Sequence, residues 1–294
     1  MKRKSPLEYS VLFTLPAVFL YTFFFILPNV LSLFLSFTDW SSYNITSLNF
    51  VGLDNFKQML VYPIFFPSII NTLYFTAVTV VIKTALGFFL ALALDSNIKA
   101  KNIHRTIIFS PVVMNFIVVG IIFKSVVFDP YNGVINKVLQ SIGLGFLKKA
   151  WLADISTALN SVCIMDIWMG AGMTMIIFIA ALQSVPKEYY EAATIDGAGS
   201  LRRMVHITLP LIIHSVTVNF LLNLVNGTKV FGQVYALTNG GPVDSTQVYG
   251  TFMFKAFSEG LFGFSSAANL LFTIAICTLS FIVLKIFRRR EVEY

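Results

Sequence analysis

Three asparagines occur at helical spacing inside one apolar stretch of the chain. Asn219, Asn223 and Asn226 are four and three residues apart, so they share one face of a helix, and Val230 continues that face. Amides in hydrocarbon are costly unless they contact protein or water. The pattern predicts either a polar lining, with Gly227 giving room beside it, or hydrogen bonds that hold helices together.

An earlier apolar stretch carries a second face of this kind. Asp166, Met169, Gly170 and Met173 follow one another at intervals of three, one and three residues, which places them on one side of a helix. The carboxylate of Asp166 is too short to reach the membrane surface easily, so we expect it to face a cavity. Close helix packing is the alternative for the glycine. Lys83 either extends to the membrane surface or faces the interior.

Patterns typical of enzymes are missing from the sequence. No His, Cys, Asp and Glu residues have metal-ligand spacing, and no local motif indicates a Ser-His-Asp triad. A G-x-x-x-x-G-K-[ST] phosphate loop does not occur. We therefore expect no catalytic residues, no metal and no nucleotide bound by this chain itself.

The composition indicates which elements hold these faces. Of the 294 residues, 56% are hydrophobic and only 12% are charged, against roughly 25% charged in soluble domains. So few charges cannot cover a water-soluble surface, which excludes a soluble enzyme, a disordered protein and a secreted disulfide scaffold. The net charge of +7 fits basic residues at membrane edges better than nucleic-acid binding. The prediction is an all-α polytopic membrane protein.

Six apolar runs are long enough to cross a membrane, within one transmembrane domain that comprises residues 1–294. The predicted spans are 11–37, 69–94, 105–128, 159–182, 209–231 and 265–287. The first run exceeds the apolar length of a signal peptide and no small-residue cleavage site follows it, so we expect it to be retained.

The distribution of basic residues predicts the orientation. With both termini in the cytoplasm, thirteen Lys and Arg residues fall on the cytoplasmic side and seven on the longer external loops. Cytoplasmic loops carry the excess of Lys and Arg. Both termini are therefore predicted to be cytoplasmic.

The loop 183–208 is the one long cytoplasmic loop and is predicted to form a helix–turn–helix. Ser184 can cap a first helix, Gly197 ends it, and Ser200 can cap a second helix that continues into the fifth span. We expect Ala192 and Ala193 to be exposed and to form a smooth surface.

The charges of this loop cancel. They belong to Lys187, Arg202, Arg203, Glu188, Glu191 and Asp196. A helix that rests on lipid would be basic, so a surface that docks another protein is the better interpretation.

Seven positions of this region match, at fixed spacing, the EAA motif of permease subunits of bacterial ABC importers. They are Glu191, Ala192, Ala193, Gly197, Ile207, Leu209 and Pro210. Segments 51–56, 128–136 and 237–242 resemble the carbohydrate-importing branch, of the maltose and glycerol-3-phosphate type. The chain thus resembles this family from end to end.

The resemblance implies the fold of a type I ABC importer permease in the bacterial cytoplasmic membrane. It implies ATP-driven uptake of a carbohydrate, in particular an oligosaccharide, by alternating access. The expected partners are a second, related permease in a heterodimer, two ATPase subunits and an extracytoplasmic sugar-binding protein. ATP and Mg²⁺ would be bound by the ATPases, and this chain would bind no cofactor.

The resemblance also assigns residues to two sites. Contact with the ATPases is expected from Glu188, Glu191, Ala192, Ala193, Asp196, Gly197 and Arg202. An alignment without gaps from the motif puts Met169, Gly170, Met173, Asn223, Asn226, Gly227 and Val230 at the substrate. Asp166 and Asn219 share the same helix faces and complete the predicted set. It contains no aromatic residue, so we expect ring stacking from the partner permease.

One position departs from the family pattern. Gly232 follows Phe231 where this branch often has Asp, so the role of that acid near the external gate is not carried over. The alternative function is a secondary transporter or channel without ATPase partners. The absence of an internal repeat and the single intramembrane acid count against it.

Overall fold

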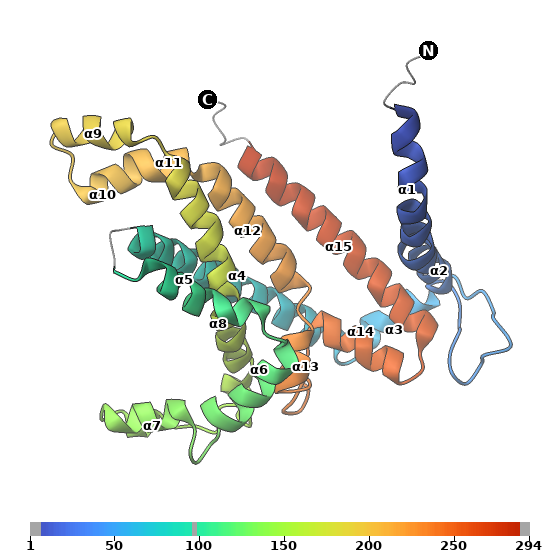
Figure 1. Ribbon diagram of the computed structural model, residues 1–294. Helices are drawn as coiled ribbons and strands as arrows, with labels where there is room; N and C mark the ends of the chain where they lie inside the picture. The colour runs from blue at the N-terminus through green and yellow to red at the C-terminus, as the bar shows by residue number, and fades with distance from the viewer. Residues whose placement is uncertain (1–6, 96–98, 289–294) are drawn as a thin grey trace, which may run out of the picture. The chain divides into compact units, whose positions relative to one another are not determined.

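The described part of the computed structural model, residues 7–95 and 99–288, contains helices and no strand (Figure 1). The basic residues Lys2, Arg3, Lys4, Arg289 and Arg290, which helped to predict the orientation, lie outside these ranges. The α-helices are α1 (Leu7–Tyr21), α2 (Leu27–Leu35), α3 (Asp54–Val61), α4 (Phe65–Asp95), α5 (Lys101–Phe109), α6 (Phe116–Ile122), α7 (Val134–Ser141), α8 (Ile155–Ser184), α9 (Lys187–Ile195), α10 (Ser200–Arg203), α11 (Leu209–Leu211), α12 (Ile213–Thr228), α13 (Gly232–Leu237), α14 (Tyr249–Ser258) and α15 (Phe262–Arg288). Short π or 3₁₀ segments are η1 (Thr22–Ile26), η2 (Ser110–Val113), η3 (Phe123–Val127), η4 (Gly145–Leu147) and η5 (Met204–Thr208).

Four continuous helical stretches are long and apolar enough to cross a membrane. They are Phe13–Leu35, Phe65–Asp95, Ile155–Ser184 and Phe262–Lys285. Two further spans arise if each of two bent helix pairs counts as one span. The described residues thus contain four such helices, or up to six spans if the bent pairs are counted, which is compatible with the six predicted spans.

The third span, predicted over 105–128, is broken into two helices. Lys101–Val113 and Phe116–Val127 meet at 102°. Pro111 lies in the 3₁₀ turn before the break, and Met114 is extended. Asn115 then starts α6, because its Oδ1 accepts a hydrogen bond of 2.8 Å from the backbone N–H of Ile117.

The fifth span, predicted over 209–231, is also broken. Ser200–Leu211 and Ile213–Thr228 meet at 71°. Pro210 has no N–H for the helix ladder, a π-helical segment precedes it, and Ile212 leaves helical geometry with ψ near 11°. The Ile212 side chain is buried in the core that α4 and α8 share, so packing fixes the position of the bend.

The chain divides into two compact units. One comprises Pro63–Phe252 and the described part of Ile276–Tyr294. In this larger unit α4 packs along α8, and α12 packs on α4 (Figure 1). A Cβ at Gly87 of α4 would lie 2.5 Å from the Thr174 side chain of α8, so glycine permits this close approach.

The smaller unit comprises the described part of Met1–Tyr62, together with Met253–Ala275. Its first span contains the π-helical turn η1, which is followed by Pro28. Side chains from Phe13 to Leu31 are all exposed. A long run of exposed apolar residues is what a lipid-facing helix requires.

Candidate substrate cavity and coupling loop

A cavity of about 480 Å³ opens between α8 and α12 in the larger unit. Eight of the nine residues predicted from the sequence to contact substrate line it. They are Asp166, Met169, Gly170, Met173, Asn219, Asn223, Asn226 and Val230. The polar faces of α8 and α12 therefore line the same cavity, in agreement with the helical spacing of their residues.

Gly227 is the predicted residue that does not line this cavity. A Cβ at this position would lie 3.1 Å from the Thr76 side chain of α4. Gly227 is therefore a residue of the packing between α12 and α4.

Lys83 of α4 and Asp166 of α8 form a buried ion pair at the wall of the cavity. The Nζ–Oδ2 distance is 2.9 Å, and the two side chains are 4% and 9% exposed. Lys83 therefore faces the interior rather than the membrane surface. A Cβ at Gly170 would lie 2.8 Å from Cδ of Lys83, so this glycine makes room for the lysine stem one helical turn from Asp166.

Asp166 also connects the cavity wall to α13. Gln233 Nε2 donates a hydrogen bond of 3.1 Å to its Oδ1, so each carboxylate oxygen has a partner. Charged and hydrogen-bonded partners offset the cost of burying the acid. Asp166 therefore joins three elements, α4, α8 and α13, beside the cavity.

The three asparagines of α12 have different surroundings. Asn223 is buried, and its Nδ2 donates to the hydroxyls of Thr174 on α8 and Thr84 on α4, at 3.2 and 3.4 Å. Asn219 is 1% exposed, and its Nδ2 has no acceptor among the described residues. The side chain of Asn226 is exposed at the cavity. Asn223 thus holds helices together and the Asn219 amide nitrogen is enclosed by protein, whereas the amide of Asn226 is accessible to a ligand in the cavity.

Gly232 has a packing reason for departing from the family pattern. A Cβ at this position would lie 2.8 Å from the ring of Phe116, which lines the same cavity. Phe231 lines it too. The predicted set contains no aromatic residue because the gapless alignment covered only two helices, whereas this chain places two phenylalanines at the cavity.

Sequence reasoning missed several other lining residues. Lys83, Lys229 and Gln233 come from α4, the end of α12 and α13. A polar residue inside an apolar run was the available signal for Lys83, but its partner lies 83 positions away. No sequence feature indicated Gln233, because it lies beyond residue 231, where the predicted fifth span ends.

The loop after α8 forms the predicted helix–turn–helix, although both serine caps are wrong. Ser184 is the last residue of α8, and its Oγ donates to the Ala181 carbonyl. Ser200 is the first residue of α10, and Gly199 occupies the cap position. The predicted first helix is α9, which begins at Lys187 after Pro186.

Gly197 ends α9 as predicted. Its φ is +71°, in the left-handed region that favours glycine. The N–H of Ala198 donates to the Ala193 carbonyl, and that of Gly197 to the Thr194 carbonyl. These two bonds form the Schellman motif. Ala193 is buried rather than exposed, at 6%, and only Ala192 of the alanine pair lies on the surface.

The remaining predicted coupling residues are exposed. Glu188, Glu191, Asp196 and Arg202 make no ion pair with any residue that the structure describes. Tyr190 holds α9 to η5, because its hydroxyl lies 3.1 Å from Oγ1 of Thr208. The loop is therefore a fixed element with unpaired charges on its surface.

This architecture, with broken apolar spans around a polar cavity and a structured loop, defines a multi-pass membrane translocation subunit. Residues 83–292 match the family of binding-protein-dependent transport system inner membrane components. The chain belongs to this family, the permease subunits of ABC transporters. This membership decides against the secondary transporter or channel.

Relatives with assigned substrates are similar over nearly the whole chain. The multiple sugar-binding transport system permease protein MsmF of Streptococcus mutans is 33% identical, with 95% of each chain covered. The diacetylchitobiose uptake system permease protein NgcF of Streptomyces coelicolor is 34% identical, with 90% of this chain and 77% of that protein covered. A crystal structure of a bacterial ABC transporter that imports alginate shares the fold, with a TM-score of 0.80 at 22% identity over 96% and 95% of the two chains.

Proposed function

We propose that this chain is the permease subunit of an ATP-driven uptake system for a neutral oligosaccharide and forms half of its translocation path. The observation that carries the proposal is the cavity with its asparagine amides. The amide of Asn226 is exposed at the cavity and makes no hydrogen bond with any residue that the structure describes. It can donate to and accept from the hydroxyls of a bound sugar.

The lining of the cavity suits a sugar in a second respect. Carbohydrates have apolar ring faces as well as hydroxyls, and Phe116, Phe231 and Met173 supply apolar contacts. The names of MsmF and NgcF, which refer to sugars and a chitobiose derivative, support the same class of substrate.

Asn226→Leu tests the site directly. This change removes a donor and an acceptor at roughly constant volume, so we expect sugar uptake to fall by about tenfold or more. The complex should still assemble, and its ATPase activity should still respond to binding protein. Uptake into proteoliposomes, measured with maltotriose, arabinotriose and chitotriose, and the yield of intact complex are the two measurements.

Asn223→Leu is the matched control for Asn226→Leu. Because Asn223 bonds to threonines on two other helices, its loss should reduce assembly and uptake together. If Asn226→Leu shows that same parallel loss, Asn226 is a packing residue and leaves the proposed site.

The partners follow from this assignment. A second, related permease would complete the path, and an extracytoplasmic binding protein would deliver the sugar. Two ATPase subunits would bind ATP and Mg²⁺ and dock on the coupling loop, and this chain would bind no cofactor. Closure of the ATPases would then move α9 and switch the access of the cavity.

The orientation can be measured with single cysteines. In a background with Cys163→Ala and Cys277→Ala, we expect an impermeant thiol reagent to label Val243→Cys in whole cells but not Ser200→Cys. Both sites are exposed, and Val243 is 89% exposed, so access to the reagent depends on the side of the membrane. Labelling of Ser200→Cys alone would invert the topology and remove the loop from the cytoplasm.

A further inference from the structure

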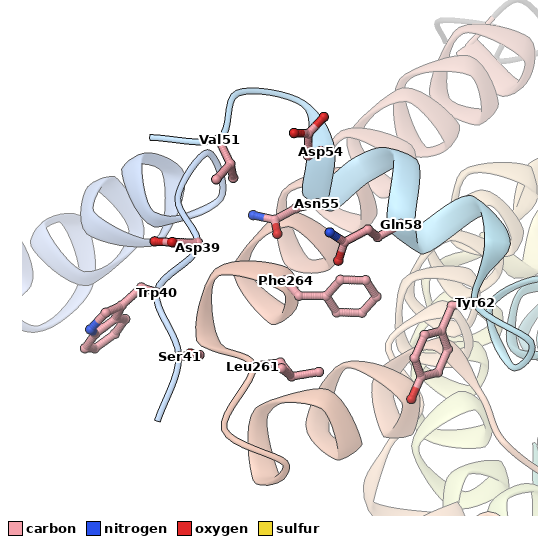
Figure 2. A pocket seen from close by; sticks show the side chains of 10 residues that line it. All are labelled: Asp39, Trp40, Ser41, Val51, Asp54, Asn55, Gln58, Tyr62, Leu261 and Phe264. Carbon is pink, nitrogen blue, oxygen red and sulfur yellow. The ribbon is translucent and has the colours of Figure 1, made fainter. Parts of the chain in front are cut away.

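The smaller unit contains a cavity of its own, of about 290 Å³ (Figure 2). Its walls come from the loop after α2, from α3 and from the start of α15. Asp54 and Asn55 belong to the 51–56 segment, for which the membrane cavity gives no role. With both termini in the cytoplasm, as proposed, the loop after α2 and helix α3 would lie on the external side of the membrane.

Backbone hydrogen bonds hold the walls in place. The N–H of Gly263 donates to the Trp40 carbonyl, and that of Ser42 to the Gly260 carbonyl, both at 2.8 Å. Gly263 is required here, because a Cβ would lie 2.1 Å from the Thr38 carbonyl oxygen. A cavity that exists before a ligand arrives loses little conformational entropy on binding.

Two amides face the cavity with hydrogen-bonding capacity left over. Asn55 is 6% exposed, and its Nδ2 donates to the carbonyls of Ser36 and Thr38 at 3.0 and 2.8 Å. Those bonds fix its orientation, and its Oδ1 has no donor among the described residues. Gln58 projects from the same side of α3, and its amide has no partner in the part of the chain that the structure describes (Figure 2). Together they offer donors and acceptors.

Two carboxylates at the cavity already have partners within the chain. Asp39 accepts from the backbone N–H and the Nδ2 of Asn49, at 2.9 and 3.0 Å, and these bonds lower the pKa of its carboxyl. Asp54 pairs with Lys57 at 2.9 Å. The neutral amides of Asn55 and Gln58 are therefore the polar groups with hydrogen-bonding capacity left for a ligand.

Aromatic and aliphatic groups supply the apolar walls. Tyr62 and Phe264 are in ring contact at 5.6 Å, and Trp40 and Leu261 also line the cavity. Aromatic rings beside oriented amides match a pyranose or furanose ring, which has apolar faces and a rim of hydroxyls. The volume is close to the lower limit for small-molecule pockets, so it suits one sugar ring.

We propose that this cavity is an external carbohydrate subsite that binds one ring of a neutral oligosaccharide through Trp40, Asn55 and Gln58. The inference rests on the proposed function, which supplies both the class of ligand and the side of the membrane. It adds a contact for the sugar outside the membrane-spanning segments.

Photolabelling of the intact importer in nanodiscs tests the subsite. The probes are maltotriose, arabinotriose and chitotriose carrying a diazirine, and peptide mass spectrometry locates the label. We expect at least one probe to label segment 36–62 or 253–275, with competition from the same free sugar and none from arginine. Trp40→Ala should reduce this labelling about tenfold, and Gln58→Ala several-fold.

Tyr43→Ala is the matched control, because Tyr43 lies in the same loop, is 87% exposed and does not line the cavity. It should leave the labelling unchanged. The subsite is refuted if no probe labels these segments, if Trp40→Ala has no more effect than Tyr43→Ala, or if arginine alone displaces the probe.

The uptake assay separates the two proposals. Sugar uptake that depends on Asn226 without labelling of the smaller unit refutes the subsite and leaves the permease assignment intact. Labelling without uptake of any of the three sugars contradicts the proposed function.

Discussion

Replacing Lys83 by Met should destabilise the protein by about 3–5 kcal/mol, since it leaves the carboxylate of Asp166 buried without its cation. The neighbouring Gln233 amide would remain, but one hydrogen bond does not compensate a buried charge. We expect a lower temperature of thermal unfolding in nanodiscs and a lower yield of intact complex.

The double variant Lys83→Met with Asp166→Leu is the control for this prediction. Removing both charges replaces the pair with apolar groups of similar size, so most of the lost stability should return. A double variant that is less stable than Lys83→Met would mean that Asp166 contributes through Gln233 and α13 rather than through the lysine.

The same double variant also distinguishes a structural pair from a functional one. Lys83 and Asp166 both line the cavity, so a stable complex without them should retain uptake if they only connect α4 and α8. Loss of uptake in a stable double variant would make the pair part of the substrate path.

Helix periodicity predicted the cavity, because the polar faces of α8 and α12 each depend on spacing within one segment. The six candidate spans were predicted from the length of apolar runs, which is also a property of single segments. The breaks near Asn115 and Ile212 were not predicted. A proline in an apolar run does not by itself show whether the helix breaks there. Packing of side chains such as Ile212 determines the position of the bend.

Contacts between distant segments were beyond prediction from the sequence alone. Nothing in the spacing of Lys83 and Asp166 pairs them, and Phe116 reaches the cavity only because α6 turns away from α5. The two predicted helix caps were wrong for a different reason. Ser184 and Ser200 have the right chemistry, but α8 continues through the first, and the backbone turn at Gly199 already precedes the second.

Gly197 ends α9 and is also one of the residues predicted to contact the ATPase subunits. Its φ of +71° is strained for any residue with a Cβ and most strained for a β-branched one. Gly197→Val should therefore break the Schellman turn and shift α9 relative to α10, at a cost of about 1–3 kcal/mol. The substitution does not alter the membrane-spanning helices, so insertion of the protein into the membrane should be normal.

The expected result for Gly197→Val is a loss of at least tenfold in ATP hydrolysis stimulated by binding protein, or failure to retain the ATPase subunits. Gly199→Val is the matched control. Both glycines have open space where a Cβ would go, but Gly199 has φ −66° and extended backbone that valine adopts readily. Gly197→Asn should be intermediate, because asparagine tolerates the left-handed region. If Gly197→Val hydrolyses ATP and transports sugar as well as Gly199→Val does, the conformation of this turn does not transmit force. The exposed charges of α9 alone must then account for docking of the ATPases.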